Sequence, residues 1–136
     1  MSETQVSVGA IAAEAKPIEQ SETAGQPKLA FNDWLKAELR VGLIELVEEI
    51  AGKDKLYKLS VDFGTEQGKK IIVAGLRPYY LKEELQGKKC PFVFNLAPAK
   101  LAGIESNGMI LAARSSENKY KVFFSDDSVP QGSRLE

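Results

Sequence analysis

The sequence predicts an all-β fold with little helix, and three observations support this. Residues 57–63 read Tyr-Lys-Leu-Ser-Val-Asp-Phe, and this alternation of apolar and polar side chains is typical of a strand with one buried face. Glycine-containing turns at 51–54 and 64–69 separate this run from its neighbours. Helical patterns are short: one turn at 31–36 and a helix at 80–86 that Gly87 would end.

The expected elements follow one another closely. The turn at 31–36 should begin near Asn32 or Asp33 and direct Phe31, Trp34 and Leu35 towards a core. Gly42 marks a bend or bulge in the first strand. Pro91 should place its nitrogen where no ladder partner is needed. Strands are expected at 40–49, 57–63, 70–74, 89–96, 108–114, 120–124 and 133–135.

This order predicts an OB fold, a five-stranded Greek-key barrel with a short helix between strands 3 and 4. Such barrels bind oligonucleotides or oligosaccharides on an open face and its loops. The length of 136 residues fits one domain. Residues 1–28 contain no aromatic side chain and are rich in Ala, Glu, Gln, Ser and Thr, so we expect a flexible tail or linker there, with a transient helix around 9–16 left open. The barrel domain would span 29–136.

Composition narrows the class of protein. The single cysteine excludes an internal disulfide and fits a reducing compartment, and the opening residues do not resemble a secretory signal. With no apolar run long enough for a membrane span, the expected location is cytoplasmic. The net charge of −1 and the pI of about 5.7 argue against strong non-specific binding to nucleic acid. Balanced totals can still conceal a basic face.

The connection from 95 to 109 is the candidate binding segment. Asn95, Lys100, Ser106 and Met109 offer an amide, a cation, a hydroxyl and a soft apolar tip, which suit a polyanion carrying sugars and bases. Lysines in the turn 53–58 would neutralise phosphates. Each group also has an ordinary structural interpretation: the lysines as a solvated turn, Ser106 as a brace, Met109 as core filling.

Aromatic side chains could stack on bases, and Tyr57 and Tyr79 are the candidates. Tyr79 and Tyr80 are equally expected to pack the small helix onto the barrel.

Catalysis is not predicted, and neither a cofactor nor a metal is expected. The chain has no histidine, the usual proton shuttle and commonest metal ligand. Cys90 precedes Pro91 in an apolar strand, as a buried thiol would. The segment 64–70 differs from a phosphate-binding loop in its spacing and in ending with Lys70. Asp126 and Asp127 alone do not define a metal site.

Several blocks in order resemble the structure-specific tRNA-binding domain of the OB fold. That domain is appended to methionyl-tRNA synthetases, and also occurs as a free-standing tRNA-binding protein and in endothelial monocyte-activating polypeptide II. The resemblance implies non-catalytic tRNA binding in support of aminoacylation, a methionyl-tRNA synthetase as partner, and a homodimer. The blocks are 31–42, 54–57, 75–80, 83–88, 95–100 and 103–109.

The resemblance and the lysine turn together assign the RNA-binding residues. They are Arg40, Lys53, Lys55, Asn95, Lys100, Ser106 and Met109. Two departures from the family pattern bear on affinity. Ile50 and Ala51 stand where the family usually has a His-Pro pair, and Leu101 and Ala102 stand where it often has a basic residue.

Two other functions stay open. A dimeric, export-related peptide-binding chaperone of the same fold resembles the chain at 31–42 and 61–64, whereas 78–80 and 107–109 are closer to the tRNA-binding branch. A scaffold for synthetase assembly is the third. Residues 1–28 are either a linker from a larger synthetase or the start of a stand-alone protein.

Overall fold

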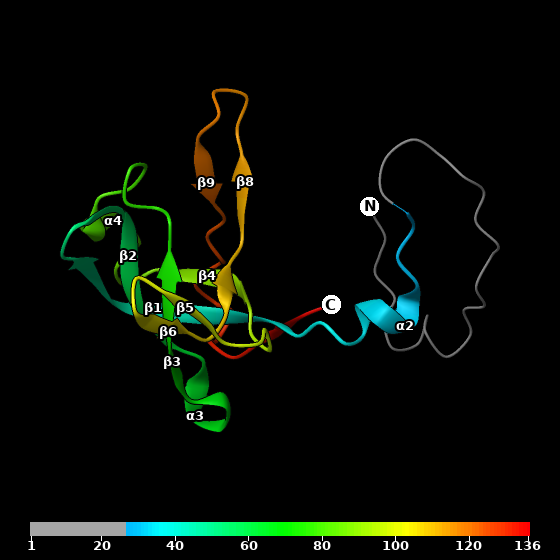
Figure 1. The fold of residues 1–136 in the computed structure, drawn as a ribbon. Helices are drawn as coiled ribbons and strands as arrows, with labels where there is room; N and C mark the ends of the chain where they lie inside the picture. The colour runs from blue at the N-terminus through cyan, green and yellow to red at the C-terminus, as the bar shows by residue number, and fades with distance from the viewer. Residues whose placement is uncertain (1–26) are drawn as a thin grey trace. The chain divides into compact units, whose positions relative to one another are not determined.

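A computed structural model describes residues 27–136, and residues 38–135 of these form one compact unit built mainly from antiparallel strands (Figure 1). The predicted all-β class is confirmed. The strands are β1 (Leu39–Ile50), β2 (Lys53–Asp62), β3 (Lys69–Ala74), β4 (Lys89–Val93), β5 (Ala99–Leu101), β6 (Ile104–Ser106), β7 (Met109–Ile110), β8 (Ala112–Arg114), β9 (Tyr120–Val122) and β10 (Arg134–Leu135). The helical turns are α2 (Phe31–Trp34), α3 (Gly64–Gln67) and α4 (Lys82–Leu85).

The long strand β1 organises the main sheet. It lies between β2 and β4 in the order β3-β2-β1-β4-β7, and its first residues also pair with β10. The two ends of this order approach each other, because Asn107 N–H donates to Ile71 O at 2.9 Å and Val73 N–H donates to Ser106 Oγ at 2.9 Å. With the helix α4 between β3 and β4, this is the strand order of the predicted OB barrel.

The core fills the space inside this curved sheet. The alternation at 57–63 is confirmed, since Tyr57, Leu59, Val61 and Phe63 are all buried. The rings of Phe63 and Phe92 meet edge to face with centroids 5.4 Å apart, a favoured aromatic geometry. Leu85 of α4 is fully buried against the same cluster.

Several predicted elements differ in extent: the strand expected at 57–63 begins at Lys53, and those expected at 89–96 and 120–124 end at Val93 and Val122. The helix expected at 80–86 is the shorter α4, because the N–H groups of Tyr79 and Tyr80 both bond to Leu76 O in a separate turn. Gly87 follows it with a left-handed φ of 85°, as expected for a residue that ends a helix. The strand expected at 108–114 is divided into β7, which pairs with β4, and β8, which pairs with β9.

The remaining expectations concern the ends of the described chain. The helical turn near Phe31 is confirmed, but Ala30 precedes it without a side-chain cap. The expected burial of Phe31, Trp34 and Leu35 is wrong, since no residue of α2 is buried and Leu35 is 42% exposed. The predicted tail 1–28 falls almost wholly outside the described residues and stays a prediction. No described helix is long and apolar enough to cross a membrane.

Gly42 is closely packed against core side chains, and the bulge expected there lies elsewhere. The register between β1 and β2 shifts after Ile44, not at Gly42. A Cβ atom at Gly42 would lie 2.5 Å from Val61 Cγ1 and 2.7 Å from Phe63 Cε1. The glycine is therefore required for close packing. Pro91 behaves as expected: it lies opposite Val41 in the register of β1 and β4, and the Val41 carbonyl accepts from Gly132 N–H, so the missing N–H of Pro91 leaves this acceptor paired.

Replacing Gly42 with alanine should lower the free energy of unfolding by about 1–3 kcal/mol, because an added methyl group forces the core to expand. Chemical denaturation would measure the loss. Gly75→Ala is the matched control, since its Cβ would meet nothing closer than Lys55 O at 3.8 Å. Equal stability of the two variants would contradict the packing role.

Candidate nucleic-acid interface

The segment 95–109 is a β-hairpin followed by a braced turn. Strands β5 and β6 pair Leu101 with Ile104, which leaves a two-residue loop. Its residues Ala102 and Gly103 have φ values of 54° and 77°, as a type I′ turn requires. The hairpin places Lys100 opposite Glu105 with both side chains exposed. What the sequence indicated as a loop is therefore a regular element.

Ser106 fixes this hairpin to the barrel. Its side chain is buried, and its hydroxyl accepts from Val73 N–H at 2.9 Å and donates to Gly108 O at 3.3 Å. The hydroxyl is therefore used within the protein both as an acceptor and as a donor. The geometry favours the bracing role of Ser106 over direct contact with RNA.

Gly108 brings β7 close to its neighbours. Its φ is 144°, and a Cβ atom there would lie 2.8 Å from Val93 O and 3.1 Å from Ile72 Cδ1. A side chain at this position would push β7 away from β3 and β4. Close approach here sets the position of Met109, the next residue.

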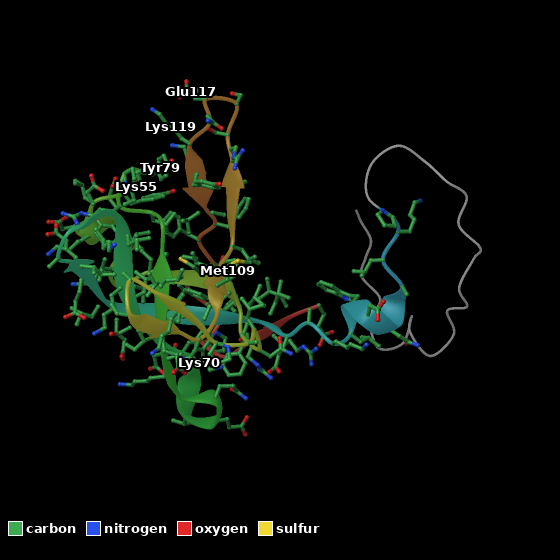
Figure 2. The ribbon with its side chains drawn as sticks, viewed as in Figure 1. Lys55, Lys70, Tyr79, Met109, Glu117 and Lys119 are labelled. Atoms are coloured by element: carbon green, nitrogen blue, oxygen red, sulfur yellow. The ribbon has the colours of Figure 1, made fainter. Side chains whose placement is uncertain are left out.

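A shallow, mainly apolar pocket of about 390 Å³ opens beside Met109. Val73, Leu76 and Ile110 are buried and form part of its floor. Met109 and Tyr120 also line it, and Met109 is 47% exposed. The interpretation of Met109 as core filling is therefore wrong: the side chain is available to a ligand. Figure 2 labels Met109 near the base of the β8–β9 hairpin.

Tyr120 is held in place by two neighbours. Its ring meets that of Tyr79 edge to face, with centroids 5.6 Å apart. The guanidinium of Arg114 lies 5.3 Å from the ring centroid and donates from Nη2 to the Tyr120 hydroxyl at 2.7 Å. This hydrogen bond raises the pKa of Arg114 above its already high ordinary value, so the group stays cationic. Tyr79 thus packs against the β8–β9 hairpin.

Tyr57 and Tyr80 are structural. Tyr57 is buried and its hydroxyl donates to Tyr80 O at 2.7 Å, which removes it as a stacking candidate. Burial raises the pKa of the Tyr57 hydroxyl, with a smaller contribution from Glu49. Tyr80 accepts a hydrogen bond from Val122 N–H at 2.9 Å and so attaches β9 to the turn after β3.

The lysines of the turn 53–58 lie next to the turn that follows β3. Arg77 Nη1 donates to Lys53 O at 3.0 Å, and the backbone of Lys55 lies beside Gly75, which lines the pocket. The side chains of Lys53 and Lys55 are exposed. Lys55 and Tyr79 lie on the same side of the barrel in Figure 2. The backbone of Lys55 therefore lies beside the pocket that Met109 lines, and Lys53 is joined to the same turn through Arg77.

Arg40 and Asn95 are engaged within the protein. Arg40 forms an ion pair with Glu38 at 2.5 Å and donates to Gly132 O at 2.6 Å. Asn95 Oδ1 accepts from Glu38 N–H at 2.8 Å. Both side chains anchor the first residues of β1 to other segments. Their contact with RNA stays a prediction, and this geometry gives them a supporting role.

Comparison with known proteins identifies the family. The family described as "Putative tRNA binding domain" matches residues 39–134. The chain belongs to this family.

Relatives of this tRNA-binding domain family occur within larger enzymes and as separate proteins. A methionine–tRNA ligase of Methanosarcina acetivorans is 39% identical over 134 residues, covering 98% of this chain and 18% of that protein. A methionine–tRNA ligase of Thermococcus onnurineus is 40% identical over 121 residues, covering 89% of this chain and 16% of the ligase. The chain thus spans less than a fifth of the length of these relatives.

Solved structures agree with this placement. A MetRS related protein from Pyrococcus horikoshii superimposes with a TM-score of 0.77 at 36% identity, covering 82% of this chain and all of that one. The chaperone CsaA from Bacillus anthracis gives a TM-score of 0.72 at 26% identity, covering 81% of this chain and all of that one. The predicted resemblance to the domain carried by methionyl-tRNA synthetases is confirmed.

Sequence reasoning missed the part of the site that β8 and β9 supply. Tyr120 and Arg114 share one face of this hairpin through the register pair Arg114↔Tyr120. Alternation within 120–124 indicated a strand, but its partner and the proximity of Tyr79 depend on tertiary structure. Cys90 matches its predicted role, since it is fully buried and burial raises the pKa of its thiol to about 12, which leaves it protonated and unreactive.

Replacing Ser106 with alanine should lower the free energy of unfolding by about 1–3 kcal/mol, because Val73 N–H would lose its buried acceptor. Thermal or denaturant unfolding would measure this. Ser116→Ala is a matched control at an exposed serine. Should the two variants unfold alike, the brace would contribute little, and a contact with RNA would again be the better account of Ser106.

Proposed function

We propose that this chain binds tRNA by its folded shape, without catalysis, in support of aminoacylation. The observation that carries the proposal is a family match over residues 39–134 on a barrel whose face combines exposed lysines with the apolar pocket beside Met109. Lysines bind phosphate through charge, and the pocket provides a surface for an exposed base or sugar. Neither feature supplies a nucleophile or a proton shuttle.

The proposed contacts divide by chemistry. Lys53, Lys55 and Lys100 neutralise phosphates, and Met109 lies against the nucleoside. Arg40, Asn95 and Ser106 hold the segments that present them. For about three phosphate contacts, the slope of log K against log salt concentration should be near −2 to −3.

The wider biological setting follows from the relatives. Their names make a methionyl-tRNA synthetase the proposed partner, acting within the same polypeptide or as a separate protein. A cytoplasmic location and a homodimer are part of the proposal, since translation takes place there and the resemblance implies dimer formation.

A peptide-binding chaperone is the second candidate. The similarity to the CsaA chaperone and a second apolar groove of about 340 Å³ favour it. Phe123 and Phe124 line this groove and are more than 45% exposed, at 58% and 49%. Binding of tRNA ranks first because the family match and the relatives of higher sequence identity support it.

Binding should depend on RNA structure. We expect the protein to bind native tRNA more tightly than the same RNA unfolded by heat without magnesium, because lysines on a rigid barrel match a fixed arrangement of phosphates. Titration of native tRNA, unfolded tRNA and a denatured peptide in parallel would test this. Preference for the peptide, with slowed aggregation of a denatured client, would replace this function with the chaperone.

Lys100→Ala should weaken binding to all tRNAs to a similar extent and reduce the magnitude of the salt slope by about one, because a single phosphate contact is lost. The measurement is affinity across several salt concentrations. Lys69→Ala serves as the control, since Lys69 is exposed at the start of β3 and pairs with Glu45 at 3.2 Å. Unchanged affinity of Lys100→Ala would remove Lys100 from the site.

A further inference from the structure

We propose that the pocket beside Met109 receives one unstacked nucleobase of the RNA, which lies against the ring of Tyr120. This inference rests on the proposed function and adds the β8–β9 hairpin to the binding surface. Tyr120 and Met109 both line the pocket, so a flat aromatic ligand would contact the tyrosine ring and the thioether side chain together. Tyr79 and Arg114 are positioning residues, because they act through Tyr120.

The pocket suits a base in its chemical character. Its floor includes buried Val73, Leu76 and Ile110, which present apolar surface and few groups that would need a specific hydrogen-bonding partner. Stacking on an aromatic ring tolerates any base, since every base has a π face. A pocket of this kind therefore fits a protein that reads the shape of an RNA and not its sequence.

The ring of Tyr120 is preorganised for this contact. Tyr79 packs against it with an interplanar angle of 74°, and the hydrogen bond from Arg114 fixes its hydroxyl. Val122, two residues on, is bonded to Tyr80, so the strand that carries Tyr120 is attached to the barrel. A side chain held in advance loses less conformational entropy on binding.

The charge around the pocket selects a polyanion over an apolar peptide. Across residues 112–122, Arg114, Lys119 and Lys121 are basic and only Glu117 is acidic. Lys119 and Glu117 lie on the outer part of the hairpin, where Figure 2 labels them, and Lys119 Nζ is 3.7 Å from Glu117 Oε1. On the β2 side, the backbone of Lys55 lies beside Gly75 of the pocket lining, and Arg77, which donates to Lys53 O, also pairs with Glu49 at 3.4 Å. Phosphates on either side of an inserted base would thus meet cations.

Three variants of the full chain test the proposal by titration with native tRNA at several salt concentrations. Tyr120→Leu keeps apolar volume and removes the ring, and we expect at least about a fivefold loss of affinity with an unchanged salt slope. Tyr120→Phe keeps the ring and should bind within about twofold of the native protein. Phe123→Leu, at an exposed ring that lines the other groove, should bind like the native protein.

The outcomes separate the inference from the function. If native protein fails to bind tRNA, the proposed function fails. If native protein binds and Tyr120→Leu binds equally well, the stacking pocket is overturned while tRNA binding stands. The stacking pocket would also be overturned if a denatured peptide occupied the pocket and displaced the tRNA from it. Should Tyr120→Leu fail to fold, photocrosslinking of native protein to 4-thiouridine-substituted tRNA decides: adducts at Met109 or Tyr120 support the pocket, and adducts confined elsewhere refute it.

Discussion

The whole barrel depends on β1, because this strand pairs with several other strands at once. Its first half pairs with β4 and β10, and from Leu43 onwards it pairs with β2, with a shift in register after Ile44. Such a strand must curve sharply, and Gly42 permits this because Val61 and Phe63 occupy the space that its side chain would fill. This close contact lets Val61 and Phe63 pack together with Phe92 of β4 directly over β1.

The binding face is assembled by polar contacts of the backbone more than by its own side chains. Ser106 and Asn107 attach the β5–β6 hairpin to β3, and Tyr80 attaches the β8–β9 hairpin to the turn after β3. Strand β3 and the residues that follow it thus connect both hairpins and the lysine turn. Because each connection is made by a buried or half-buried group, the exposed side chains keep fixed separations, which recognition of a folded RNA requires.

The sequence was sufficient for the fold class and for most strands, because alternation and turn residues are local signals. It was insufficient wherever a residue's role depends on a distant partner. Ser106 and Met109 are close in sequence, yet the Ser106 side chain is buried and accepts a hydrogen bond from Val73 N–H, whereas the Met109 side chain after Gly108 is exposed. Arg40 has the charge expected of an RNA contact, but its guanidinium is engaged in an ion pair with Glu38 and a hydrogen bond to Gly132 O. The hairpin β5–β6 escaped prediction because three-residue strands give almost no periodic signal.

The lysines and the pocket contribute differently to recognition. Phosphate contacts add affinity for any nucleic acid and weaken with salt, so the lysines distinguish a folded tRNA from an unfolded one only through the spacing at which the barrel holds them. An acidic chain with a net charge of −1 also gains little from its overall field. Discrimination must then come from geometry: a base can enter the pocket only if the backbone phosphates around it fall near Lys53, Lys55 and the hairpin. In the proposed mode of binding, the apolar pocket would convert a weak, general attraction into a requirement for shape.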